Sequence, residues 1–256
     1  MAVYLITGGS SGIGRGLAIE MAKRGHAVGI IARREELLKE VADEIAATGA
    51  KVAWAKADVT DAPQMTEAVR SIEAELGVVD VVLANAGGGG PMPVKKWSGE
   101  TAKWVMKLNY EGTINTIDPV LPAMIERGSG HIAVVSSVAG YRGIPPGGPY
   151  SAAKSAVSVL FEALSVELWP RGIAVTSIHP GFIDTPIHGP DGAKHPTPFM
   201  ISTDKAVQII ANGLERRRRF INFPFPMAAF MQFVRLIPSF IFEPLMYRTI
   251  PPKLRS

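Results

Sequence analysis

At 256 residues, the chain is long enough for one large α/β domain with a full core, or for two small domains. The absence of cysteine excludes disulfides, a thiolate nucleophile and cysteine-ligated metals, and it fits a reducing, cytoplasmic location. A net charge of +4 is too small to indicate nucleic acid binding, so we expect no nucleic acid partner. His179, His188 and His195 are scattered over predicted loops and no His/Asp/Glu cluster has ligand spacing, so we expect no metal site.

The N-terminal segment combines a strand, a glycine-rich loop and a helix. Residues 3–7 are apolar and rich in β-forming types, and apolar residues at helical spacing begin at Leu17. Between them, Thr7-Gly8-Gly9-Ser10-Ser11-Gly12-Ile13-Gly14 has a Gly-xxx-Gly-x-Gly spacing, which differs from the commonest dinucleotide fingerprint. A P-loop is the competing interpretation, but no Gly-Lys-Ser/Thr follows. Glycines let backbone N–H groups approach a pyrophosphate at a helix N-terminus, so the pattern predicts a dinucleotide-phosphate site.

A second strand is predicted over residues 27–32, and Arg33 and Arg34 follow it directly. An NAD enzyme often carries an acidic residue there, which binds the ribose 2′-hydroxyl. Two guanidinium groups suit the 2′-phosphate of NADP instead. The alternative is a helix N-terminal region that happens to be basic. We therefore expect NADP(H) to be preferred over NAD(H).

Strands and helices alternate through the rest of the chain. Further strands are predicted over 51–57, 78–84, 130–136 and 173–178, and helices over 35–48, 62–76, 103–117, 150–169 and 203–219. This alternation predicts an α/β fold, a Rossmann-type doubly wound parallel sheet in a single domain. Ligands bind such sheets outside the carboxyl ends of the strands. The loops that carry Asn85, Ser137 and Tyr150 should meet at that edge.

Tyr150 and Lys154 stand four residues apart in a predicted helix and therefore share one face. An ammonium beside a phenol favours the phenolate and lowers the pKa of the phenol from about 10. The pair would then exchange protons near neutral pH. The alternative is an ordinary surface pair.

These segments together resemble the short-chain dehydrogenase/reductase (SDR) family, in its branch of about 250 residues, over roughly residues 3–220. The motifs occur in the family's order and at its usual separations. They are the Thr7–Gly14 loop, Asp58-Val59, Asn85-Ala86-Gly87, Asn109, Ser137, Tyr150-xxx-Lys154 and Pro180-Gly181.

The resemblance implies a role for each candidate catalytic residue. Tyr150 would be the general acid/base, and Lys154 would lower its pKa and hold the nicotinamide ribose. Ser137 would hydrogen-bond the substrate oxygen; Ser136 is the rival, but Ser137 keeps the family's separation from the tyrosine. Asn109 would hold a water that links Lys154 to solvent, or would simply cap a helix bend.

The resemblance also implies the cofactor contacts. The glycine loop would bind the pyrophosphate, Asp58 and Val59 the adenine, and residues 85–87 the ribose, with Ile183 and Thr185 on the carboxamide. The expected cofactor-binding set is Gly8, Ser10, Ser11, Gly12, Ile13, Gly14, Arg33, Arg34, Asp58, Val59, Asn85, Ala86, Gly87, Tyr150, Lys154, Pro180, Gly181, Ile183 and Thr185.

Two regions depart from a minimal domain. Residues 182–202 form a long loop rich in proline and glycine, which in this family is the substrate flap. Residues 1–225 would form the catalytic domain, closed by a strand at 220–225, and 226–256 an apolar C-terminal extension with a helix at 227–237. The extension would cover the cleft or an interface, lie on a membrane with the Arg216–Arg219 cluster holding anionic lipid, or be simple core.

The sequence thus predicts an NADP(H)-dependent oxidoreductase that interconverts a secondary alcohol and a ketone or aldehyde. An apolar substrate is expected from the apolar extension. The alternatives are a catalytically silent SDR-fold cofactor sensor or scaffold, and a membrane-surface lipid- or steroid-type dehydrogenase. Family members are often homodimers or homotetramers built on the two long helices, here those that carry Asn109 and Tyr150.

Overall fold

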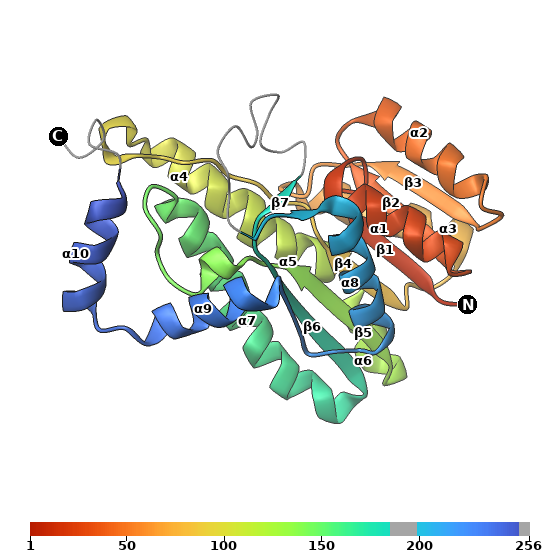
Figure 1. The fold of residues 1–256 in the computed structure, drawn as a ribbon. Coiled ribbons are helices and arrows are strands. Elements are labelled where there is room, and N and C mark those ends of the chain that lie inside the picture. The colour runs from red at the N-terminus through yellow and green to blue at the C-terminus, as the bar shows by residue number, and fades with distance from the viewer. Residues whose placement is uncertain (185–198, 251–256) are drawn as a thin grey trace.

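The computed structural model describes residues 1–184 and 199–250 (Figure 1). Within them, seven parallel strands form one sheet in the order β3-β2-β1-β4-β5-β6-β9. The strands are β1 (Val3–Thr7), β2 (Ala27–Ala32), β3 (Val52–Lys56), β4 (Val81–Ala84), β5 (Gly130–Val135), β6 (Ile173–Pro180) and β9 (Phe220–Phe223). A separate two-stranded pair joins β7 (Ile183–Asp184) to β8 (Ile201–Ser202). The strand order reverses between β1 and β4, which is where doubly wound sheets bind ligands.

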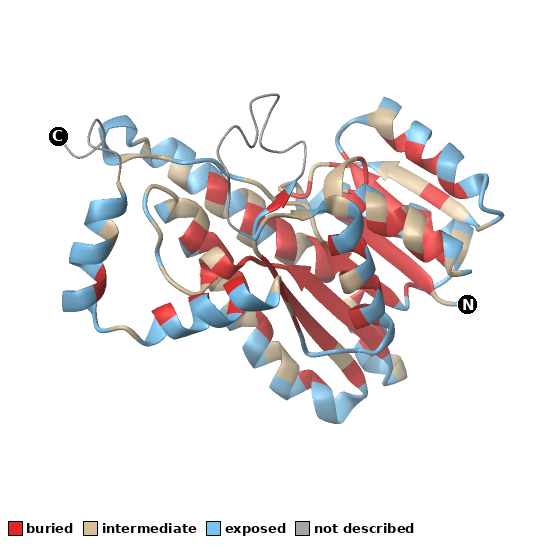
Figure 2. Ribbon diagram, viewed as in Figure 1, coloured by how far each residue is buried: buried red, intermediate tan, exposed pale blue. Residues whose placement is uncertain are grey.

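Helices cover both faces of the sheet (Figures 1 and 2). One core layer joins it to α1 (Gly12–Lys23), α2 (Glu35–Ala46) and α8 (Thr203–Glu215). The other contains α3 (Ala62–Leu76), α5 (Gly112–Ile117), α6 (Leu121–Arg127) and α7 (Gly148–Leu168). The central strands are buried along their whole length, because each has a helix layer on either side. The predicted doubly wound Rossmann-type sheet is confirmed.

The helix predicted over residues 103–117 is longer and irregular. It begins as α4 (Gly99–Met106), where the Ser98 hydroxyl accepts a hydrogen bond from the Thr101 amide. It continues through a π-helical turn, η2 (Lys107–Glu111), into α5. Such turns insert one extra residue into the helical ladder and often lie at functional sites.

The structure corrects two features predicted around residues 216–219. The helix expected to reach Arg219 ends at Glu215, because the chain turns sharply at Arg217, which has a φ of 47°. The Arg216–Arg219 cluster therefore lies at the amino end of β9, whereas the C-terminal helices follow its carboxyl end. The cluster and the start of the apolar extension thus lie at opposite ends of β9. This arrangement argues against a single membrane contact that includes both.

After β9 the chain forms α9 (Phe225–Leu236) and α10 (Ser239–Thr249), and α10 stands away from the body of the molecule (Figure 1). The helix predicted at 227–237 corresponds to α9, but α10 was not predicted. The chosen boundary at residue 225 remains a prediction. In the part of the chain that the structure describes, no helix has the length and apolar content needed to cross a bilayer.

Candidate active site

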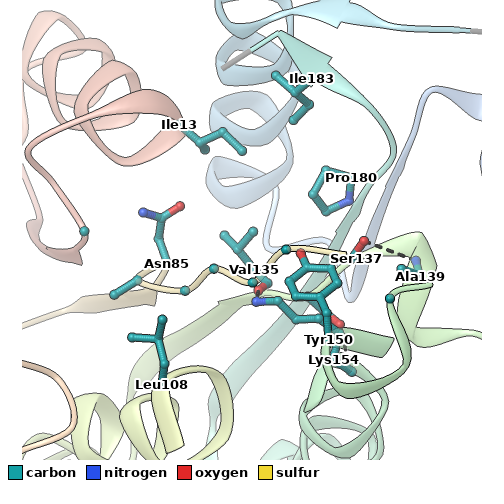
Figure 3. A pocket seen from close by; sticks show the side chains of 18 of the residues that line it. Ile13, Asn85, Leu108, Val135, Ser137, Ala139, Tyr150, Lys154, Pro180 and Ile183 are labelled. Carbon is teal, nitrogen blue, oxygen red and sulfur yellow. Dashed lines mark hydrogen bonds between the residues drawn. The ribbon is translucent and has the colours of Figure 1, made fainter. Parts of the chain in front are cut away.

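A cavity of about 1040 Å³ opens at the carboxyl ends of the strands. One end is lined by the glycine loop and the residues after β2 and β3, the other by α7, α9 and the loop that follows β5. Figure 3 shows Asn85, Ser137, Tyr150 and Ile183 around this space, each from a different element. Predicted site residues that line it are Gly8, Ser10, Ser11, Ile13, Arg33, Arg34, Asp58, Val59, Asn85, Ala86, Gly87, Ser137, Tyr150, Lys154, Pro180, Gly181 and Ile183.

The glycine loop places the start of α1 at the cavity. Gly8 has a φ of +68°, and a Cβ there would lie 2.9 Å from the side-chain nitrogen (Nδ2) of Asn85. A Cβ on Gly14 would lie 2.4 Å from the Gly8 carbonyl oxygen, so only glycine lets α1 lie this close to the loop. Gly12 and Gly14 therefore shape the loop without lining the cavity. The Ser11 side chain does not cap α1, and the first turn carries no acidic residue.

Thr7 and Asn85 join β1 to β4 at this edge. The Thr7 hydroxyl accepts hydrogen bonds from the amides of Asn85 (3.2 Å) and Ala86 (3.3 Å), and the Asn85 side chain donates to the Thr7 carbonyl (2.9 Å). These bonds hold residues 85–87 against the glycine loop. The assignment of Asn85 to the cofactor stays a prediction, whereas its hydrogen bonds with Thr7 show that it holds the loop in shape.

Two arginines and one carboxylate lie at the ends of β2 and β3. The Arg34 guanidinium donates to the Ser11 hydroxyl at 2.9 Å and to Ser10 at 3.4 Å. Arg33 lies 3.6 Å from the Asp58 carboxylate and is largely exposed. Partial burial raises the pKa of Asp58, but hydrogen bonds from Thr60 and the nearby Arg33 outweigh it and lower that pKa. Arg33 and Arg34 both line the cavity, together with Ser10 and Ser11 of the glycine loop.

Tyr150 and Ser137 face the same part of the cavity (Figure 3). The Ser137 hydroxyl accepts a hydrogen bond from the Ala139 amide at 3.1 Å, which leaves its own proton free to donate. Burial raises the pKa of Tyr150, and a hydrogen bond with Ser137 partly opposes that rise. At neutral pH the phenol is therefore protonated.

The predicted lowering of the Tyr150 pKa by Lys154 is not what the structure shows. The Lys154 ammonium donates to the Val135 carbonyl at 2.8 Å and lies 5.7 Å from the centre of the Tyr150 ring. Burial lowers the pKa of Lys154 to about 8. The ammonium of Lys154 points toward the end of β5. The neighbour that opposes the burial-induced rise in the pKa of Tyr150 is Ser137 and not Lys154.

The rival serine, Ser136, has a different role. Its hydroxyl donates to the Lys154 carbonyl at 2.9 Å and pairs with the Ser158 hydroxyl at 2.8 Å. Ser158 in turn contacts His179, whose other ring nitrogen lies 3.0 Å from the Asn222 oxygen. This buried chain ties α7 to β5, β6 and β9. Sequence analysis missed it, since its members are far apart in the chain.

Asn109 lies in the π-helical turn and is fully buried beneath the cavity. Its side chain accepts from the Gly88 amide at 3.1 Å and donates to the carbonyl oxygens of Gly88 (2.6 Å) and Val105 (2.8 Å). A Cβ on Gly87 would lie 2.7 Å from the Asn109 oxygen and 3.1 Å from the Lys154 nitrogen. Asn109 thus anchors the loop after β4 next to Lys154, and its predicted relay role remains a prediction.

The far side of the cavity is formed by Pro180, Gly181 and Ile183. The Gly181 amide donates to the Phe223 carbonyl at 2.7 Å, which fixes the turn after β6. Thr185 and most of the predicted flap lie outside the described residues. Val138 and Ile144 also line the cavity and were not predicted to do so. Phe182 of the predicted flap lines it as well, and so do Met227, Phe230 and Met231, which agrees with the alternative in which the extension covers the cleft.

The glycine cradle, the uncapped start of α1 and the polar residues that line this end of the cavity suit a nucleotide. Fold and site together define a dinucleotide-binding α/β protein. Among the described residues, no group of three or more His, Asp or Glu side chains could hold a metal ion.

Comparisons with known proteins agree with this class. A family model described as "short chain dehydrogenase" matches residues 2–195. An uncharacterized oxidoreductase of Myxococcus xanthus is 37% identical over 239 residues, covering 93% of this chain and 94% of the relative. A single-residue variant of the actinorhodin polyketide ketoreductase, solved with NADPH, is 28% identical with a TM-score of 0.80, covering 89% of this chain and 97% of that one. A short chain dehydrogenase from Mycobacterium paratuberculosis, solved with NAD, is 26% identical with a TM-score of 0.76, covering 86% and 94%.

The chain belongs to the short-chain dehydrogenase/reductase family. It is an oxidoreductase with a nucleotide-binding Rossmann fold, and the similar structures hold NAD or NADPH.

Proposed function

We propose that this protein is an NADP(H)-dependent oxidoreductase that interconverts a secondary alcohol and a ketone or aldehyde. The observation that carries the proposal is the convergence of Tyr150 and Ser137 on one cavity, which extends to the glycine loop and Arg33. A catalytically silent sensor or scaffold would need none of the three side chains Ser137, Tyr150 and Lys154 at that place.

In carbonyl reduction, the bound nicotinamide supplies the hydride. The Tyr150 hydroxyl, protonated at neutral pH because burial raises its pKa, donates its proton to the carbonyl oxygen. The Ser137 hydroxyl, turned by the Ala139 amide, donates a hydrogen bond to the same oxygen and stabilises its developing charge. In alcohol oxidation the phenolate of Tyr150 takes the proton back.

Lys154 and Asn109 support this pair. One ammonium proton of Lys154 is held by the Val135 carbonyl, and the other two can donate to the nicotinamide ribose. For Asn109 we retain the proposal that it holds a proton-relay water next to Lys154.

The preference for NADP(H) rests on Arg33 and Arg34. Both line the adenine end of the cavity, and residues 32–34 contain no acid. A 2′-phosphate would accept charge-assisted hydrogen bonds from the two guanidinium groups. The Arg33–Asp58 contact is largely exposed and therefore weak, so a phosphate can compete for Arg33.

The substrate we propose is apolar beyond its reacting oxygen. Val138, Ile144 and Phe182 line the cavity near Tyr150 and Ser137, and α9 adds Met227 and Met231. This lining supports a hydrophobic alcohol or ketone.

For assembly we propose a homodimer or homotetramer built on α4 and α7. These helices pack against each other and expose Trp104, Val159 and Val166, which would be covered in such an assembly. Sedimentation velocity tests this: a monomer at micromolar concentration would contradict it.

For location we propose the cytoplasm, with membrane-surface contact through the exposed apolar residues of α9 and α10 as the alternative. Phe233, Leu236 and Phe240 are each more than half exposed, and Phe230 lies at the rim of the cavity. Co-sedimentation with vesicles of anionic lipid decides between the two: binding by the intact chain that is lost on removal of residues 226–256 supports the membrane alternative.

The experiment that tests the function follows NADPH absorbance with a panel of ketones, aldehydes and secondary alcohols. We expect reduction of several hydrophobic carbonyls, and a loss of kcat of about 10²–10⁴-fold in Tyr150→Phe with the Kd for NADPH retained. Near-full activity of Tyr150→Phe would overturn the assignment of the acid/base.

A further inference from the structure

Helix α9 packs directly behind the active-site serine. Val138, which follows Ser137, forms a buried cluster with Met227, Ala228 and Met231 of α9. Tyr141 and Ile144, from the loop that leads to Tyr150, pack against the same cluster. The C-terminal extension therefore forms a wall of the cavity, starting one residue away from the proposed catalytic centre.

The charged side chains that line the cavity are unevenly distributed. Among the described lining residues they are Arg33, Arg34, Asp58 and Lys154. The first three lie after β2 and β3, and Lys154 donates to the Val135 carbonyl. The wall that α9 forms with Val138, Ile144 and Phe182 is uncharged. A carboxylate, phosphate or ammonium on the substrate would find no charged partner among the described residues of this wall, which disfavours charged groups there.

Arg142 is the arginine closest in sequence to this wall, and its guanidinium is already engaged. It donates to the carbonyl oxygens of Val234 (2.9 Å), Arg235 (3.3 Å) and Ile237, at the end of α9. It also lies 3.9 Å from the centre of the Phe242 ring of α10. The guanidinium thus holds α9 and α10 and is not free to bind a substrate anion.

The wall consists of side chains that can adjust to a ligand. Met227 and Met231 stand one helical turn apart, and unbranched thioethers adapt to irregular apolar shapes. Phe230 also lines the cavity but is 63% exposed, so it stands at the rim. A group that passes Met231 would reach the surface of α9 beside Phe230.

We propose that Met227, Phe230 and Met231 form a subsite for an uncharged hydrocarbon chain of the substrate. The substrate class is then an open-chain alcohol or ketone with several carbons beyond the reacting centre, whose chain runs along α9 toward Phe230. This inference rests on the proposed function and adds the place and the kind of group that determine specificity.

A homologous series of 2-alkanones from 2-butanone to 2-decanone, assayed with NADPH, tests the subsite. We expect kcat/KM to rise about fourfold for each methylene that enters it. In Phe230→Ala, the ratio of kcat/KM for 2-decanone to kcat/KM for 2-butanone should fall about fivefold. Phe233→Ala is the matched control, since Phe233 is 64% exposed on the same helix but does not line the cavity.

Binding without turnover separates this inference from the proposed function. Calorimetric titration of the enzyme–NADPH complex, which cannot oxidise an alcohol, with 2-butanol, 2-hexanol and 2-decanol should show the same gain in affinity with chain length. Phe230→Ala should lose the same part of that gain. If the alcohols bind with this pattern but no ketone is reduced, the subsite stands and the proposed reaction fails. If ketones are reduced without a dependence on chain length, or if both alanine variants behave alike, the subsite is wrong and the reaction stands.

Discussion

The ammonium of Lys154 donates a hydrogen bond to the carbonyl oxygen of Val135, 2.8 Å away, at the carboxyl end of β5. Lys154 is 4% exposed, and burial lowers its pKa from 10.5 to about 8. A lysine buried in this way costs stability whenever it is charged, because one hydrogen bond does not replace its hydration.

The first prediction is therefore a rise in stability with pH. Between pH 8 and 10.5 the unfolded chain keeps the Lys154 proton while the folded chain loses it, so unfolding takes up a proton and stability increases with pH. The free energy of unfolding, measured by urea titration, should rise by roughly 3 kcal/mol across this range relative to Lys154→Met. Other groups titrate in both proteins and cancel. A constant difference between the two would mean that the ammonium is not desolvated.

A second prediction concerns Arg33 and the 2′-phosphate. Loss of a charge-assisted hydrogen bond should weaken NADPH binding about 10- to 100-fold in Arg33→Ala and leave NADH binding nearly unchanged. The measurement is the Kd of each cofactor from the change in its fluorescence. Arg15→Ala is the control, since Arg15 lies on α1, pairs with Glu44 at 2.6 Å and does not line the cavity. Equal affinity of the wild type for both cofactors would remove the basis for an NADP preference.

Much of the fold was predictable because its causes are local. A strand buried on both faces gives a continuous apolar run, as in Val3–Thr7 and Ala27–Ala32, and both strands have the predicted bounds. Helix ends followed their caps, such as Asp61, whose side chain accepts from the Gln64 amide at 3.0 Å. The spacing of Tyr150 and Lys154 likewise placed both residues on one face of α7.

The features that escaped prediction depend on contacts between distant segments. The direction of Lys154 is determined by the Val135 carbonyl, nineteen residues earlier. The place of α9 depends on Arg142, more than ninety residues before the carbonyl groups it binds. No local pattern contains that pairing. From the sequence, an apolar helix at the C-terminus was therefore compatible with a cleft cover, an interface, a membrane contact or simple core. Its packing on Val138 shows that one face of α9 lies against the cleft.

The third prediction follows from the contact between Gly14 and Gly8. A methyl group on Gly14 would lie 2.4 Å from the Gly8 carbonyl oxygen and 2.5 Å from the side-chain nitrogen of Asn85, so α1 must move away. Gly14→Ala should lower the free energy of unfolding by about 1–3 kcal/mol and weaken binding of both NADPH and NADH. Gly99→Ala is the matched control, because nothing lies within 4 Å of its added methyl group. Unchanged cofactor affinity in Gly14→Ala would show that the loop tolerates the shift.

The last prediction concerns the attachment of the C-terminal helices by Arg142. Its hydrogen bonds to Val234 and Arg235 and its contact with the Phe242 ring join the loop after Ser137 to both α9 and α10. Arg142→Ala removes all of them, whereas the main core layers remain intact. We expect chymotrypsin to cleave the exposed aromatic sites Phe240 and Tyr247 at least tenfold faster in this variant, with little change in the Tm of the domain.

Arg235→Ala serves as the control, since it removes an exposed arginine from the same helix and keeps the backbone carbonyl that Arg142 binds. Mass spectrometry of the fragments identifies the cleavage sites. Since α9 forms a wall of the cavity, its release should also raise the KM for hydrophobic ketones. The effect on kcat should be smaller, because Tyr150 lies on α7 and Ser137 follows β5, and the Arg142 side chain holds neither element. Equal cleavage rates in both variants would show that α9 and α10 are held by the Met227 and Met231 packing alone.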